Sequence, residues 1–171
     1  VSGEVYLNGK RFGYVEAEKE LEILKLGSGI YKIEIKSADG FIFTKNVEVK
    51  TGEKTSVQIQ ATKVMCQVNS LGKLTINGKD FGEIKKDKVL LLPNGEYKFS
   101  FAIGKQKPKE EKISTASKSS FEINFKTTKL AVESLIDGRL YIDGIYYGYV
   151  TKNRTFNVDS PLFEGTYDIE V

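Results

Sequence analysis

The chain contains no histidine and no tryptophan among its 171 residues. Histidine is the side chain whose charge changes near neutral pH, the usual general base and the commonest metal ligand. Its absence excludes Ser-His-Asp and Cys-His catalytic sets and most transition-metal sites. No other combination of residues suggests a catalytic set, a cofactor site or a metal site. The sequence therefore predicts a protein that is not an enzyme and uses no cofactor.

The few remaining reactive groups have simpler explanations. Cys66 is the single cysteine and alternates with Val64 and Val68, so we interpret it as a small core side chain rather than a nucleophile, a lipid or redox site, or a disulfide partner. Glu110 and Glu111 are adjacent in a lysine-rich stretch and lack the spacing of a calcium-binding loop. We expect them to face solvent instead of forming a glycosidase pair or a calcium site.

Long apolar runs are absent as well, and proline is scarce. No run approaches the roughly 20 apolar residues that span a bilayer, and the N-terminus has no basic start followed by an apolar core. We expect no membrane span and no targeting signal within these residues. Only three prolines occur, and 40% of the residues are hydrophobic. This composition is typical of a globular chain with packed cores rather than of a disordered one.

What the sequence does contain is an internal repeat. Two landmarks align in three places without gaps. The first landmark occupies residues 3–13, 72–82 and 138–148, and the second occupies residues 29–35, 95–101 and 165–171. The glycines of the first landmark, Gly9, Gly78 and Gly144, are 69 and 66 residues apart. This period is longer than the coil of a solenoid and has the size of a small domain.

The first landmark predicts a β-hairpin in each copy. Its Asn-Gly or Asp-Gly dipeptide lies between alternating apolar residues, and such a pair favours a type I′ turn because both positions then take a positive φ. In a plain two-residue hairpin the core-facing opposite pairs are Val5 with Phe12, Leu74 with Phe81, and Leu140 with Tyr147.

The second landmark predicts a strand with one buried and one solvent-facing side. Tyr31, Ile33 and Ile35 share one face because side chains alternate along a strand. Turn signals at residues 39–40 and 51–53 then mark further strands that end near Ile59. No segment keeps a helical apolar period, so the fold class predicted is all-β.

The linkers define the copies. Thr62 and Thr128 each lie ten residues ahead of the glycine that opens the first landmark, so each copy begins with a strand of its own. This divides the chain into three parts: residues 1–62, a copy without its first strand; residues 63–128, a complete copy; and residues 129–171, a truncated copy. A complete copy has about seven short strands, which suits a small Greek-key sandwich.

Two further expectations follow from this division. In the middle copy, we expect core positions at Val68, Leu74, Ile76, Phe81, Tyr97, Phe99 and Phe101. The two incomplete copies have unpaired edges and small cores. We therefore expect each to be completed by a neighbouring copy, another chain or residues outside this sequence.

The succession of strand, Asn/Asp-Gly, short strand ending in glycine, and Gly-x-Tyr strand resembles the PEGA domain, and the resemblance covers essentially the whole chain. No copy keeps the literal Pro-Glu-Gly-Ala tetrapeptide. The resemblance implies tandem all-β modules of prealbumin-like fold, found in bacterial and archaeal surface-layer-like and envelope proteins. It implies a cell-envelope or extracellular location and brings no shared catalytic or ligand-binding residues.

Charge differs between the copies. Residues 1–62 carry nine basic and nine acidic side chains, residues 63–128 thirteen and seven, and residues 129–171 four and seven. The thirteen basic residues of the middle copy are all lysine. Specific nucleic-acid binding is not expected there because arginine supplies the bidentate contacts. The lysines either form a patch for an acidic glycan or envelope polymer or cover solvent-facing strands and edges.

The third copy alone carries an aromatic pair on the outer face of its hairpin. The register places Tyr141 opposite Tyr146, away from Leu140 and Ile142. Such a pair can stack on a sugar ring or anchor a partner protein. Alternatively, it stabilises its own hairpin by about 0.2–1 kcal/mol or packs against a neighbouring copy.

Two functions therefore remain as expectations. The first is a non-catalytic structural or spacer array of a bacterial cell-envelope or surface protein, favoured by the tandem copies and the missing chemistry. The second is a module that binds a glycan or a protein through its exposed aromatics and lysine-rich middle copy.

Overall fold

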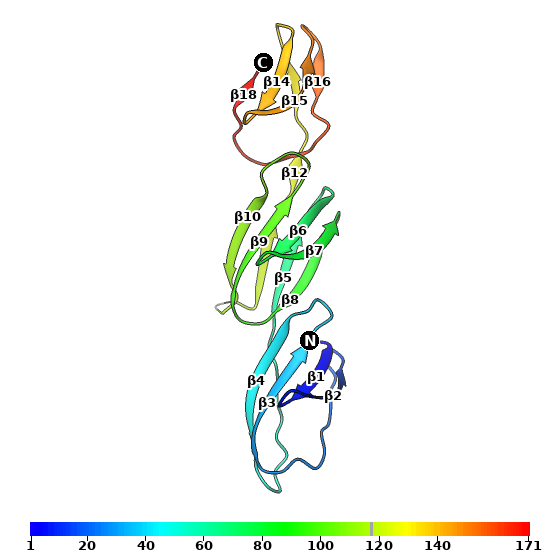
Figure 1. The fold of residues 1–171 in the computed structure, drawn as a ribbon, viewed down its shortest axis with the longest axis vertical. Coiled ribbons are helices and arrows are strands. Elements are labelled where there is room, and N and C mark those ends of the chain that lie inside the picture. Colours follow the sequence, from blue (N-terminus) through cyan, green and yellow to red (C-terminus); the bar gives the residue numbers. More distant parts are fainter. Residues whose placement is uncertain (117) are drawn as a thin grey trace. The chain divides into compact units, whose positions relative to one another are not determined.

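The computed structural model describes residues 1–116 and 118–171, and it confirms the all-β fold class: no helix occurs among these residues (Figure 1). The first strands are β1 (Gly3–Leu7), β2 (Lys10–Val15), β3 (Gly29–Lys36) and β4 (Ile42–Val49). The next are β5 (Thr62–Gln67), β6 (Gly72–Ile76), β7 (Lys79–Ile84), β8 (Lys88–Leu92), β9 (Glu96–Ala102), β10 (Lys109–Ser114) and β11 (Ser120–Asn124). The last are β12 (Thr127–Thr128), β13 (Ala131–Glu133), β14 (Gly138–Ile142), β15 (Ile145–Val150), β16 (Thr155–Asn157), β17 (Leu162–Phe163) and β18 (Ile169–Glu170).

The chain divides into two compact units. The first comprises Val1–Val64, Leu90–Gly95 and Ser114–Phe121; the second comprises Met65–Val89, Glu96–Ile113 and Glu122–Val171. The boundary between the two units passes through the middle copy and does not coincide with the boundaries of the sequence repeat. The boundaries after residues 62 and 128 therefore stay predictions.

The first copy is built around one antiparallel sheet in the order β2-β1-β3-β4 (Figure 1). Alternation along β1 places Val5 and Leu7 inside and Tyr6 outside. Val5, Ile35 and Phe43 form the buried cluster, against which Ile59 and Ala61 pack from the segment after β4. The core of this copy is therefore small.

Among the described residues, two sheets of the middle copy together contain seven strands, β5 to β11, which is about the number expected for a complete copy. The sheets have the orders β10-β9-β6-β7 and β11-β5-β8. Five of the seven expected core residues are buried: Val68, Leu74, Ile76, Phe99 and Phe101. Phe81 and Tyr97 are partly buried. The Greek-key and prealbumin-like topology remains a prediction.

The third copy belongs wholly to the second unit. Its sheet has the order β15-β14-β18, and two short pairs, β13 with β16 and β12 with β17, lie beside it in the chain. A buried cluster consists of Leu140, Ile142, Val150, Val158 and Leu162. Among the described residues, strand β18 pairs only with β14. The other side of β18 is therefore an unpaired sheet edge, as expected for the truncated copy.

The three hairpin turns agree with the predicted type. Asn8 and Gly9 have φ values of 47° and 80°, and the corresponding residues of the other two copies have φ values between 49° and 76°. The strands join through two-residue loops, with Leu7 paired to Lys10 in the first copy. The turn prediction is therefore confirmed.

The expected opposite pairs are wrong by one residue. Val5 lies opposite Gly13 rather than Phe12, and Leu140 lies opposite Gly148 rather than Tyr147, because each hairpin contains a register shift after its second pair. The middle hairpin has a shift between Lys73 and Thr75. An extra residue in one strand is a β-bulge, and it redirects the side chains around it. Phe12 is 43% exposed, whereas its equivalent Tyr147 packs against the core of the third copy.

A reciprocal pair of hydrogen bonds recurs in all three copies at the hairpin turn. The first turn residue donates its backbone N–H to a carbonyl on the Gly-x-Tyr strand, and its side-chain Oδ1 accepts the backbone N–H of that same strand residue. The partners are Asn8 with Lys32, Asn77 with Lys98, and Asp143 with Asp168, at distances of 2.7 to 3.0 Å. We call this contact the turn lock. It joins the two sequence landmarks physically.

The strand expected to end near Ile59 does not form. Residues 53–61 contain no regular strand, although Val57, Ile59 and Ala61 are partly buried and alternate with exposed residues. By the repeat alignment this segment corresponds to β11, which pairs with β5 in the middle copy. The first copy has no strand equivalent to β5 in this sequence. A strand needs a partner to satisfy its backbone groups, so the segment stays irregular.

The turn lock predicts a graded loss of stability in the middle copy. Asn77→Ala removes the side-chain acceptor of Lys98 and places a residue with a Cβ at a φ of 50°. We expect the free energy of unfolding to fall by about 2 kcal/mol in urea titration. Asn77→Gly keeps the turn conformation and loses only the acceptor, so its loss should be about 1 kcal/mol. The control Asn94→Ala, at an exposed asparagine of the same copy, should change stability by less than about 0.5 kcal/mol. Equal effects of Asn77→Ala and Asn94→Ala would contradict the lock.

Candidate functional site

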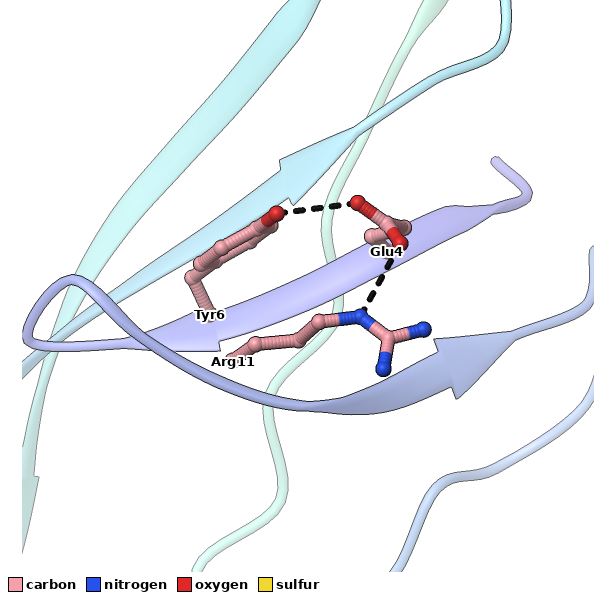
Figure 2. Close-up of polar contacts among 3 residues, drawn as sticks. All are labelled: Glu4, Tyr6 and Arg11. Carbon is pink, nitrogen blue, oxygen red and sulfur yellow. Dashed lines mark hydrogen bonds and ion pairs between the residues drawn. The ribbon is translucent and has the colours of Figure 1, made fainter.

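The outer face of each hairpin presents side chains at equivalent positions, and in the first copy they form a polar cluster (Figure 2). The Tyr6 hydroxyl donates to Glu4 Oε2 at 2.9 Å, and Arg11 Nε donates to Glu4 Oε1 at 2.9 Å. These hydrogen bonds, first that of Tyr6 and then that of Arg11, lower the pKa of Glu4, and the bond to Glu4 raises the pKa of Tyr6. The Lys36 ammonium lies 4.0 Å from the centre of the Tyr6 ring. The cluster satisfies its own charges.

The middle copy closes the same position with an ion pair. Lys73 Nζ lies 2.8 Å from Asp80 Oδ2, and the backbone N–H of Gly82 donates to Asp80 Oδ1 at 2.8 Å. The hydrogen bond between Lys73 and Asp80 is the main cause of the lowered pKa of Asp80 and of the raised pKa of Lys73. Both side chains are largely exposed, so the pair contributes little to stability.

The third copy has tyrosines where the other two have charges. Tyr141 lies opposite Tyr146, as predicted, with ring centres 5.6 Å apart and planes at 54°. Leu140 and Ile142 point into the core on the other face. Tyr146 is 45% exposed. The pairing is thus confirmed, while the role of the pair in binding stays a prediction.

The bulge adds one residue, Tyr149, to this outer face. A plain two-residue hairpin puts Tyr149 opposite Gly138, on the inner face; in the structure it lies opposite Arg139 and is 57% exposed. Tyr149 therefore joins Tyr141 and Tyr146 on the outer face. The glycine at the bulge, Gly148, is the feature of the sequence that could have indicated it. A Cβ at this position would overlap the Phe156 ring.

Arg139 is the charged member of this face and has no ion-pair partner among the residues that the structure describes. Its equivalent in the middle copy, Lys73, pairs with Asp80, but the position of Asp80 is taken by Tyr146 here. We call Arg139, Tyr141, Tyr146 and Tyr149 the tyrosine face. A guanidinium beside exposed aromatic rings can donate to an oxygen-rich ligand while the rings supply contact area.

The reactive side chains considered from the sequence, a cysteine and a surface carboxylate, lie in positions that do not favour catalysis or metal binding. Burial raises the pKa of the Cys66 thiol to about 12, and its side chain is inaccessible. Glu110 is exposed on β10 and pairs with Lys98 at 2.7 Å. No group of three or more cysteine, aspartate and glutamate residues in the described part of the chain is arranged to hold a metal ion. The described residues also contain no helix that is long and apolar enough to cross a membrane.

Several lysines of the middle copy contact neighbouring side chains rather than forming one open patch. Lys79 and Lys88 place their ammonium groups 5.3 and 5.8 Å from the centre of the Phe81 ring. The pairs of Lys73 and Lys98 with carboxylates add to this. These contacts favour the interpretation of the lysines as solvent-facing cover for the strands.

Comparison with family models, with curated proteins and with solved structures finds no match for this chain.

Proposed function

We propose that the chain is a non-catalytic structural array, a stiff spacer of tandem β modules in a bacterial cell-envelope or surface protein. The observation that carries this proposal is the joint between the middle and third copies, which lies entirely within the second compact unit. A spacer needs joints that resist bending, and flexible linkers do not supply this property.

Gln106 forms the centre of the joint. It lies in the loop after β9, and its side-chain amide donates to the Pro161 carbonyl and accepts the Phe163 backbone N–H at 3.0 Å. The Tyr167 hydroxyl donates to the Phe163 carbonyl at 2.6 Å and lies 3.4 Å from Gln106 Oε1. One glutamine of the middle copy thus bonds two backbone groups of the third copy.

Three further contacts support the joint. Lys105 Nζ donates to the Tyr146 carbonyl at 3.1 Å. Gly104 approaches Ser160 so closely that a Cβ would overlap the serine hydroxyl, and its φ is +52°. Strand β12, just ahead of the third copy, pairs with β17 inside that copy. Because the contacts come from separate segments, bending at the joint would break several of them together.

The envelope location rests on the resemblance to the PEGA domain. The tandem order of the landmarks supports this resemblance, and the equivalent turn locks agree with a repeated module. Fractionation of the source cells tests the location: recovery of the protein in the cytosol alone would contradict it.

The joint predicts that the two copies tumble as one body. In ¹⁵N relaxation measurements on the whole chain, amides of the middle and third copies should give one common rotational correlation time. Gln106→Ala removes the central contacts and should give the third copy a shorter correlation time of its own. The control Gln60→Ala, at an exposed glutamine of the first copy, should leave the common value unchanged. Independent tumbling of the two copies in the unaltered chain would rule out a stiff spacer.

A second function has one specific observation in its favour, namely the tyrosine face. Its three rings lie on one outer surface of the third copy together with Arg139, which has no ion pair with any residue that the structure describes. The matching surfaces of the other copies are closed by Glu4 with Arg11 and by Lys73 with Asp80. We propose a glycan or a partner protein as the ligand class of this surface.

The double substitution Tyr141→Ser, Tyr146→Ser separates binding from stability. If the face binds a ligand, the variant should lose at least tenfold in affinity on a glycan array or for the native partner. The matched control is Tyr14→Ser, at a 55% exposed tyrosine of the first copy, and it should bind as the unaltered protein does. Unchanged affinity with a lowered unfolding temperature would leave the pair as a hairpin-stabilising contact only.

A further inference from the structure

The acidic residues that surround the basic side chain of the middle hairpin are replaced by tyrosines in the third copy. In the middle copy, the hydrogen bond to Asp80 is the main cause of the raised pKa of Lys73, and the charge of Glu83 adds to it. The repeat alignment places Tyr146 at the position of Asp80 and Tyr149 at the position of Glu83. Both carboxylates therefore give way to aromatic rings in the third copy.

Arg139, the equivalent of Lys73, is consequently left with an open positive charge. It is exposed, and its side chain has no ion pair and no hydrogen bond with any residue that the structure describes. Glu170 shares the outer face, because it lies directly opposite Tyr141 and paired residues project to the same side. Since β14 lies between β15 and β18, Glu170 is on the other side of β14 from Tyr149. The guanidinium thus remains available to an anion.

The three tyrosine hydroxyls of this face are open as well. Elsewhere in the chain, the hydroxyls of Tyr6, Tyr31 and Tyr167 donate to a carboxylate or a backbone carbonyl of the protein. The tyrosine face forms no such bond with the part of the chain that the structure describes. A phenolic hydroxyl both donates and accepts hydrogen bonds. The face therefore combines apolar rings with free donors and acceptors, which suits the ring and the hydroxyl groups of a sugar.

The rings follow one another along the hairpin rather than around a cavity. Tyr149 lies beside Arg139, and Tyr146 lies beside Tyr141 at the next outward level, about 6.8 Å further along the strand. None of these four residues lines the cavity at Tyr147. Protein partners bind most strongly through side chains that fill pockets, whereas a linear polysaccharide can lie along a row of rings. The arrangement favours a polysaccharide.

We propose that the tyrosine face binds an acidic polysaccharide whose sugars carry carboxylates. Arg139 bonds one carboxylate, and the rings stack on the sugars beside it. This rests on the second function proposed above, in which the tyrosine face is a binding surface, and it names the ligand class. A guanidinium matches a carboxylate through two parallel hydrogen bonds. Residues 129–171 carry seven acidic and four basic side chains, so the overall charge of this copy does not attract a polyanion and recognition depends on the local contact.

The test uses the whole chain and two matched ligands. One is a hexasaccharide of galacturonic acid, and the other is the same hexasaccharide with its carboxyl groups reduced to alcohols. In calorimetric titration we expect the acidic form to bind at least about tenfold more tightly, because a hydrogen bond between charged groups adds to the stacking that both forms share. The ¹⁵N amide signals of Arg139, Tyr141, Tyr146 and Tyr149 should shift on binding and locate the site.

Substitutions at exposed charges separate the contributions. Arg139→Gln should lower the affinity for the acidic ligand to that for the neutral one and leave the neutral one unchanged. Glu170→Gln should raise the affinity for the acidic ligand roughly twofold or more, because it removes a like charge from the face. The matched control Arg154→Gln removes the same charge at another exposed arginine of the third copy and should change neither affinity. Tyr141→Ser with Tyr146→Ser should weaken both ligands.

Each other result would contradict the proposal in a recognisable way. Equal affinity for the two ligands, or equal effects of Arg139→Gln and Arg154→Gln, would overturn the acidic ligand and leave the face as a glycan-binding surface. Binding of a hexaglutamate peptide but of neither sugar would overturn it in favour of an acidic protein partner. Absence of binding to all three probes would remove the proposed binding function together with this proposal.

Discussion

The turn lock is the contact on which the rest of the structure depends. An asparagine or aspartate with positive φ ends the first strand of each hairpin and bonds a residue 21 to 25 positions further along the chain. This closes the longest connection within the sheet and fixes how the Gly-x-Tyr strand pairs with the first strand. Because a slip of one residue would turn every side chain to the opposite face, the lock also decides which side chains form the core.

The same register allows the three outer faces to differ. Once the inner positions are filled by residues such as Val5, Leu74 and Leu140, the outer positions carry no packing constraint. The first two copies use them for charged pairs and the third for tyrosines. A repeated scaffold with variable surfaces can thus act as a spacer and still offer one copy for binding. Function here is argued from the faces and joints rather than from the fold.

Much of the fold can be predicted from the sequence because turns and alternation are local signals. The Asn-Gly turns and the Tyr141–Tyr146 pair follow from two-residue loops. The bulge adds a residue that alternation does not indicate, so Val5 lies opposite Gly13 instead of Phe12, and Tyr149 lies on the outer face. Residues 54–60 have the pattern of a strand, but a strand also depends on a partner that local sequence does not reveal. The role of Gln106 depends on contacts 55 and 57 residues away and has no local signal.

Amide hydrogen exchange of the whole chain, resolved by residue, tests the central claim most directly. The backbone N–H groups of Lys32, Lys98 and Asp168 donate to the turn side chains. The account predicts slow exchange at all three, although these residues are exposed to solvent. It predicts fast exchange throughout residues 22–26, which lie between β2 and β3 and belong to no strand. Exchange at the three lock positions as fast as at residues 22–26 would show that the copies are not held by a common turn lock.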